Sequence, residues 1–266
     1  MSFQVALQLT IALLSVATLV RALEDWLTRA EYGTGGVMSA EVTALQRAWG
    51  RSLLSRLLFH ITSSHKLLNL CMLMRIALPI SLLLALSLRQ SSGLTVGLLA
   101  ANLLFAVFFL LRCGYGADGA DQMLIVVNCG ALLATSSNII VHRTGVWFIT
   151  LQLILSFFVA GLAKLFGREW RSGVAMAGIL TTARYSSSPW LGAMLVRRPV
   201  ISQALCWAVI SVETLFPVVL LGIPTLTVAT LIGGLLFHVS VAFTMGLNNF
   251  MYTFAAAYPI SVYALL

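Results

Sequence analysis

The chain has 266 residues, of which 60% are hydrophobic and 9% charged, and its mean hydropathy is +0.98. These values exclude a soluble domain of ordinary composition and predict an integral membrane protein in contact with the lipid bilayer. The net charge of +8 does not predict nucleic-acid binding, because the arginines stand in loops beside apolar stretches, where they set topology and contact headgroups.

The first apolar stretch, residues 5–23, is long enough to span a bilayer core, which requires about 20 residues per helix. Charges at helical spacing follow it, so Arg21 can pair with Glu24 or Asp25. The next segment, residues 37–66, places arginines among leucines. A basic face opposite an apolar face predicts a helix that lies in the membrane interface.

The second predicted span, residues 67–88, is interrupted by a single charge, Arg75. A guanidinium group in hydrocarbon is costly, so Arg75 is expected to face the interior of the bundle and to find an acceptor there. A third span ends near Leu111. After a glycine-rich turn, residues 123–133 begin the fourth.

The turn before the fourth span contains Asp118, Asp121 and Gln122. Two carboxylates and an amide could hold a divalent cation, but without a third charged ligand they make a weak metal site. The alternative is a helix cap, because Asp121 stands just before an apolar run and its charge favours a helix N-terminus. The sequence favours the cap, and no other metal site is expected.

Four more spans are predicted in the second half of the chain, at residues 146–165, 201–221 and 223–245 and from Phe250 to the end. The intervening segment 173–198 is too polar in its middle to cross, so an interfacial or re-entrant element is expected there. The predicted fold class is an all-α polytopic membrane bundle of about eight transmembrane helices plus interfacial helices. The whole chain, residues 1–266, is expected to form a single domain.

Basic residues are distributed unequally between the two sides of this bundle. One side holds nearly all of them, whereas the other has Arg89 and Arg143. The positive-inside rule therefore places the basic side in the cytoplasm and both termini outside. Lys164 then lies near the cytoplasmic face.

Lys164 stands near the end of the fifth span, on a helix face that Ala160 and Gly161 leave nearly bare. A neighbouring helix or a ligand can therefore approach it closely. Two interpretations are open. The lysine can snorkel, with its stem in hydrocarbon and its charge at the interface, or it can serve as a general base in an apolar pocket.

Two other ionisable residues, Glu213 and His238, stand inside predicted spans. Such groups usually face the bundle interior and often mark a substrate or proton path. Glu213 either takes part in chemistry or pairs structurally with a cation, for which the candidates are Arg21, Arg75 and Lys164. His238 is either a packing residue or a partner in proton transfer. We take Lys164, Glu213 and His238 as candidate catalytic residues around a central cavity.

Four motifs in a fixed order resemble a known family. They are GADGADQ before the fourth span, FVAGLAKL-x3-EW-x2-G at the end of the fifth, a Glu-x3-Pro span and the closing FHVSVAFTMGLNNF. From about Leu67 onward the chain resembles the horizontally transferred transmembrane (HTTM) domain family. That family includes the membrane part of vitamin K-dependent gamma-carboxylases and sporulation-delaying protein B. A multi-pass protein of the bacterial cell membrane is expected.

In the carboxylases, a lysine in a matching G-x-x-K-L setting deprotonates reduced vitamin K, and Lys164 falls on that position. The resemblance implies a carboxylase- or epoxidase-like enzyme with a reduced, vitamin K-like quinone as cofactor and with Gly161 and Trp170 as cofactor-binding residues. The carboxylases differ in carrying a histidine where this chain has Asp118 and Asp121. Their chemistry also lies on the lumenal side, whereas the arginine count places Lys164 toward the cytoplasm.

The rival expectation is a non-catalytic protein of the sporulation-delaying B type, which binds a soluble partner and helps to mature or export a secreted peptide toxin. In the enzyme hypothesis the substrate is a peptide or a lipid-soluble, quinone-like molecule. A third hypothesis is a small transporter that uses Glu213 and His238 as a proton relay.

Overall fold

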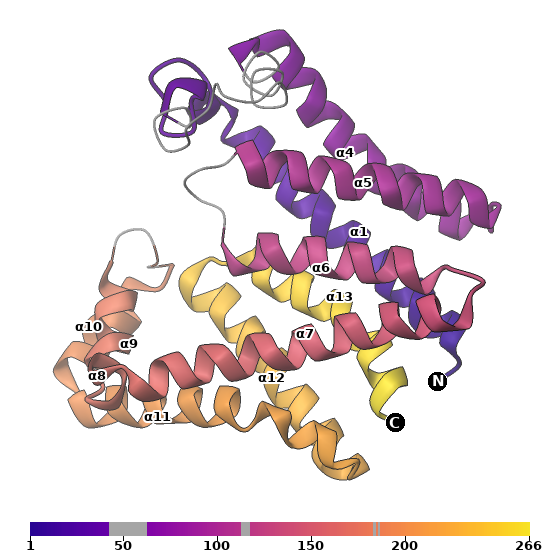
Figure 1. Cartoon of the computed structure of the whole chain (residues 1–266). Coiled ribbons are helices and arrows are strands. Elements are labelled where there is room, and N and C mark those ends of the chain that lie inside the picture. The colour runs from indigo at the N-terminus through magenta and orange to yellow at the C-terminus, as the bar shows by residue number, and fades with distance from the viewer. Residues whose placement is uncertain (43–62, 113–117, 183–184, 186) are drawn as a thin grey trace. The chain divides into compact units, whose positions relative to one another are not determined.

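The computed structural model describes residues 1–42, 63–112, 118–182, 185 and 187–266 (Figure 1). Every regular element in these residues is a helix. Six of the described helices are long and apolar enough to cross a membrane. The prediction of an all-helical, multi-pass membrane protein is therefore confirmed at this level. Most of the amphipathic segment predicted at 37–66 lies outside the described residues.

The chain forms two compact units. One consists of Leu7–Gly145, and the other of Met1–Ala6 together with Val146–Leu266. We call them the N-terminal unit and the C-terminal unit, and each is described by itself.

The N-terminal unit contains the helices from the start of the chain to α6. They are most of α1 (Phe3–Leu27), the 3₁₀ helix η1 (Arg29–Tyr32), α4 (His65–Ser87), α5 (Ser92–Arg112) and α6 (Gly119–Ala134). α4 lies beside α5, and α5 packs on α6 (Figure 1). The short connection between α4 and α5, residues 88–91, makes these two helices antiparallel neighbours.

The C-terminal unit contains the helices that follow Val146. They are most of α7 (Ile139–Phe166), α8 (Arg168–Arg171), α9 (Val174–Thr181), α10 (Pro189–Arg197), α11 (Pro199–Thr214), the 3₁₀ helix η2 (Phe216–Leu221), α12 (Pro224–Met245) and α13 (Asn248–Leu265). A proline opens α10, α11 and α12. Proline suits the first helical position because the missing N–H has no intrahelical acceptor there.

Each of the eight predicted spans falls on a helix. The six that qualify as candidate spans are α1, α4, α5, α7, α12 and α11 continued by η2. The fourth and eighth predicted spans correspond to α6, a shorter apolar helix of 16 residues, and to α13, which is not among the six. The coarse fold class therefore holds, and the count of eight spans stays a prediction.

Two short helices occupy the described part of the segment predicted to be interfacial, residues 173–198. Gly173 separates α8 from α9 with a φ of +85°, a left-handed conformation that glycine adopts without strain. A Cβ atom at Gly173 would lie 2.6 Å from the Cα of Gln203 on α11. Glycine is thus required both for the turn and for the approach of the two backbones.

The C-terminal unit has an aromatic core in which the rings of Phe157 on α7 and Phe216 on η2 stack with centroids 3.9 Å apart. Gly234 on α12 lies against both rings and against the Tyr258 hydroxyl on α13. A Cβ at Gly234 would lie 2.6 Å from that hydroxyl and 2.7 Å from Phe216. Neighbouring Gly233 has no such contact, since a Cβ there would meet nothing within 4 Å.

We predict opposite effects for alanine at these two adjacent glycines. Gly234→Ala should destabilise the protein by about 1–3 kcal/mol, because the added methyl group overpacks a ring core. Gly233→Ala should be neutral or stabilising by up to about 1 kcal/mol, because alanine is the better helix former. Thermal unfolding of both variants in the same detergent measures the difference. Equal midpoints would contradict the aromatic packing described for Gly234.

Candidate functional site

An ion pair between Lys164 on α7 and Glu213 on α11 forms the candidate site. The Lys164 Nζ atom donates to both carboxylate oxygens, at 2.6 Å to Oε2 and 2.9 Å to Oε1. The Glu213 side chain is only 4% exposed, and that of Lys164 is 20% exposed. The structure therefore brings together two of the three candidate catalytic residues. Of the three cations considered for Glu213, Lys164 is the one that it meets.

Gly161 explains how the two helices come close enough for this pair. A Cβ atom at Gly161 would lie 2.5 Å from the backbone nitrogen of Thr214 and 2.8 Å from the carbonyl carbon of Glu213. The bare face expected beside Lys164 is thus occupied by α11. Gly161 acts here through helix packing, and its assignment to cofactor binding stays a prediction.

The indole ring of Trp170 also lies close to the ammonium group. The Lys164 Nζ atom lies 5.2 Å from the centroid of the indole ring, which is within the range of a cation–π contact. Nζ also lies 3.4 Å from the carbonyl oxygen of Ala160 on its own helix. The lysine is therefore held between a carboxylate and an aromatic face, with a limited opening to the surroundings.

His238 on α12 lies in the same unit, and no hydrogen bond joins it to Lys164 or Glu213 among the described residues. Its side chain is buried among phenylalanine rings, with centroids 4.1 Å from Phe254 and 5.1 Å from Phe157. Phe157 precedes Lys164 by seven residues, two helical turns or about 10 Å along α7. Neither imidazole nitrogen has a hydrogen-bond partner among the described residues.

Sequence reasoning did not identify two further polar groups in this unit. The Tyr258 hydroxyl and Thr214 Oγ1 are buried atoms without a hydrogen-bond partner among the described residues. Tyr258 stands one turn from Phe254 on α13, so it lies near the His238 cluster. The only sequence signal for Tyr258 is a phenol inside an apolar run, which is equally typical of packing.

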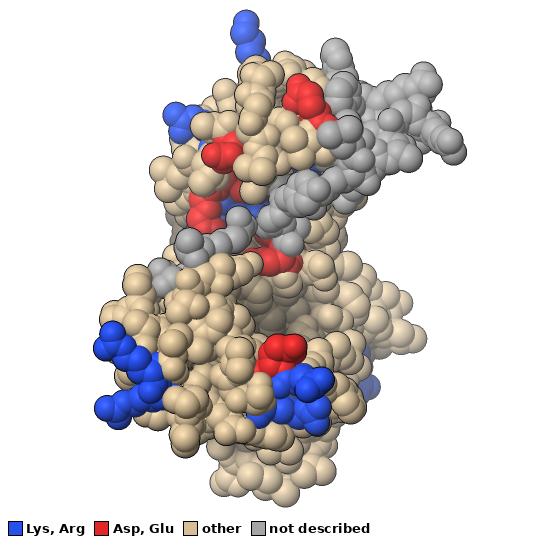
Figure 2. Space-filling view, turned by 90° about the vertical axis from the view of Figure 1, so that its left-hand side faces the viewer, with Lys and Arg blue, Asp and Glu red and all other residues tan. Residues whose placement is uncertain are grey.

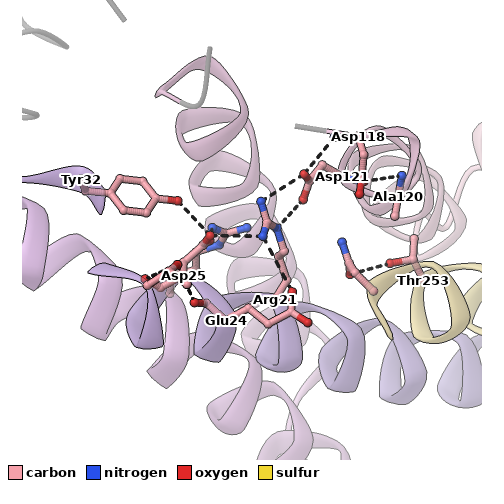
Figure 3. A network of polar contacts seen from close by, with 11 residues as sticks. Arg21, Glu24, Asp25, Tyr32, Asp118, Ala120, Asp121 and Thr253 are labelled. Atoms are coloured by element: carbon pink, nitrogen blue, oxygen red, sulfur yellow. Dashed lines mark hydrogen bonds and ion pairs between the residues drawn. The ribbon is translucent and has the colours of Figure 1, made fainter. Parts of the chain in front are cut away.

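The N-terminal unit contains a second group of charges, which Figure 3 shows as one network. Asp25 on α1 receives hydrogen bonds from Arg75 on α4 and, at 2.9 Å, from the Tyr32 hydroxyl. Arg21 forms a bidentate contact with Asp121 on α6, at 2.7 and 3.2 Å. The pairing expected within α1 is also present, because Arg21 lies 3.3 Å from Asp25 and 3.8 Å from Glu24.

Asp118 and Asp121 form a capping box at the start of α6. Asp118 is the N-cap residue and accepts from the backbone nitrogens of Ala120 and Asp121, whereas the Asp121 side chain accepts from the Asp118 nitrogen. The helix-cap interpretation is confirmed, with Asp118 rather than Asp121 as the N-cap. Burial, reinforced by the neighbouring Asp121 charge, raises the pKa of Asp118. No group of three or more metal-binding side chains occurs among the described residues.

A cavity of about 10 Å³ lies beside this network, lined by Arg21, Arg75 and Asp121 and by apolar side chains of α5 and α6. Its size suits at most one water molecule. The Nε atom of Arg75 is buried without a hydrogen-bond partner among the described residues. The network therefore acts as a closed structural cluster that joins α1, α4 and α6.

The fold and the charge pattern together define a multi-pass membrane protein with a partly buried lysine–glutamate pair in its C-terminal unit. Comparisons with protein-family models, with curated proteins and with solved structures found no match to this chain. The family resemblance seen in its motifs therefore stays a proposal.

We predict that Asp25 stabilises the folded protein by pairing with the buried Arg75. Asp25→Asn should destabilise the protein by about 3–5 kcal/mol, because it leaves the buried Arg75 cation without its carboxylate. Glu24→Gln is the matched control, since Glu24 is 36% exposed and its contact with Arg21 contributes at most about 1 kcal/mol. Thermal unfolding in detergent measures both. An Asp25→Asn variant as stable as the control would show that Arg75 does not depend on this partner.

Proposed function

We propose that this chain is a membrane enzyme that removes a proton from a lipid-soluble or peptide substrate, with Lys164 as the base and Glu213 as its proton partner. The observation that supports this proposal is the bidentate ion pair between Lys164 and Glu213 beneath Trp170. A lysine at this position is also what the resemblance to the carboxylases implies.

The pair can provide a base while its own net charge stays zero. Transfer of one proton from the Lys164 ammonium to the Glu213 carboxylate gives a neutral amine and a neutral carboxylic acid, and a low-dielectric setting favours such neutral pairs. The amine then accepts a proton from the substrate. The products are the Lys164 ammonium, the protonated Glu213 and a substrate anion next to the ammonium.

The chain's own residues also provide groups suited to a reduced quinone, the cofactor that the resemblance implies. A planar ring with two polar oxygen atoms needs apolar faces and hydrogen-bonding groups. The rings around His238 offer the faces, and His238 and Tyr258 offer buried polar atoms that are without partners among the described residues. A hydroquinone supplies an acidic hydroxyl group when bound. In the described structure these rings pack in direct contact, with Gly234 against Phe216 and the Tyr258 hydroxyl, so a quinone would have to separate them to be held by His238 and Tyr258. Lys164 with Glu213 would hold the proton.

We further propose that α6 and α13 cross the membrane with the six longer helices. The chain then has eight spans, as the sequence predicts, and every short connection joins antiparallel neighbours. The ends of α1, α5 and α7 share one side of the membrane with α8, α9 and α10. This side holds most of the arginines and is the cytoplasmic side by the positive-inside rule, in a bacterial membrane by the resemblance.

The competing function is a non-catalytic maturation or export factor of the sporulation-delaying B type. One observation favours it, namely that Glu213 is almost fully buried and meets its cation directly, as in a structural ion pair that holds α7 to α11. In that case the pair needs only a cation at position 164, and its proton chemistry is irrelevant.

Lys164→Arg separates the two functions, because arginine keeps the cation but does not release a proton at neutral pH. For the enzyme we expect turnover to fall by a factor of about 10²–10⁴ with little change in stability. The assay uses protein in nanodiscs with reduced naphthoquinone and oxygen, and mass spectrometry detects the epoxide. Lys66→Arg is the matched control, since Lys66 is the other lysine of the sequence.

Full turnover by Lys164→Arg would rule out Lys164 as the base. A wild-type protein that forms no epoxide would reject the quinone-dependent enzyme and favour the partner-binding function. Glu213→Gln should also lower turnover, because it removes the group that accepts the Lys164 proton in the proposed step. Thermal unfolding of each variant shows whether a loss of turnover reflects a loss of fold.

A further inference from the structure

We propose that the C-terminal unit carries a binding surface for the headgroups of anionic phospholipids. It consists of four arginines, Arg168 and Arg171 on α8, Arg197 at the end of α10 and Arg198 just before α11. We call these residues the arginine face. The proposal does not depend on the chemistry at Lys164.

The arginine face is built on packed helices. α10 lies on α9 with Gly192 against the backbone, where an added Cβ would lie 2.5 Å from the Leu180 carbonyl oxygen. α8 is tied to α11, because the Gln203 side-chain amide donates to the Arg171 carbonyl oxygen at 3.1 Å. The backbone that carries the four arginines is therefore fixed by contacts within one unit.

The four guanidinium groups are available to an outside partner. All four residues are exposed, and none forms an ion pair with a carboxylate within the part of the chain that the structure describes. Glu169 is the only acidic residue between Lys164 and Gln203. In the lower part of Figure 2, lysine and arginine atoms gather in separate places on this side of the C-terminal unit, and acidic atoms lie beside one of these places.

Large apolar side chains are exposed next to these charges. Trp190 on α10 is 70% exposed, Val196 is 61% exposed, and Val200 at the start of α11 is 78% exposed. Tryptophan is enriched at the level of lipid headgroups, where its ring is apolar and its N–H meets polar groups. A surface that combines such side chains with cations is typical of a helix lying in the membrane interface.

The position of the arginine face in the chain favours phospholipid as the ligand that binds there. Arg168 follows the last residue of α7 by two positions, and Arg198 directly precedes α11, both helices being candidate spans. The arginines therefore stand at the height of the phosphate groups of the bilayer that these helices cross. Every cation of the face is an arginine, and guanidinium binds phosphate in a bidentate manner.

The test measures binding of individual lipids to the full-length protein in detergent by native mass spectrometry. We expect the wild type to bind phosphatidylglycerol more tightly than phosphatidylcholine. In the double variant Arg197→Gln/Arg198→Gln, the ratio of the two affinities should fall at least about fivefold, as expected when basic residues are removed from an anionic membrane surface. The variant Arg197→Lys/Arg198→Lys should retain part of it, because the charges remain but the bidentate geometry is lost.

The matched control is Arg89→Gln/Arg143→Gln, which removes two exposed arginines from the N-terminal unit. It should leave the preference unchanged. The proposal is overturned if the wild type shows no preference for phosphatidylglycerol, or if the control loses as much as Arg197→Gln/Arg198→Gln. Displacement of the lipid by millimolar inorganic phosphate would also overturn it, since the surface would then be a site for free phosphate.

Discussion

A charge inside an apolar helix bundle needs a partner of opposite charge, and this requirement organises both units of the protein. An unpaired ion in a membrane interior costs several kcal/mol, which is comparable with the whole stability of a folded domain. Lys164 meets Glu213, Arg75 meets Asp25, and Arg21 meets Asp121. Each of these pairs joins two different helices, so satisfying the charges also fixes which helices are neighbours.

The two units use this constraint differently. In the N-terminal unit the carboxylates of Asp25 and Asp121 each accept several hydrogen bonds, and the adjacent cavity has room for at most one water molecule. In the C-terminal unit the Lys164–Glu213 pair is partly open, and His238 and Tyr258 keep buried polar atoms without partners in the described structure. Buried polar atoms without a partner among the described residues occur in both units, and Arg75 Nε is one in the first. The difference on which the proposed proton transfer rests is the partial exposure of the Lys164–Glu213 pair.

The arginine face lies close in the chain to the helices that carry the Lys164–Glu213 pair. A base inside the bundle has to be reached from the membrane, and the helices that carry Lys164 and Glu213 end and begin next to that face. Headgroup contacts at the arginine face would fix the depth of α7 and α11 in the bilayer. The position of the Lys164–Glu213 pair relative to the lipid would then be fixed as well.

The sequence by itself determined the helices and the residues that needed explanation. Each span predicted from hydropathy coincides with a helix of the structure. The cost of burying charge identified Arg75, Lys164 and Glu213 as residues that need a partner. Only the tertiary structure decided the partners, because Lys164 and Glu213 are 49 residues apart and Arg21 and Asp121 are 100 apart. Helical periodicity relates residues within a few turns of one helix, whereas the choice of partner depends on which helices pack together. That choice rests on close approaches such as Gly161 against Thr214, which no local pattern contains.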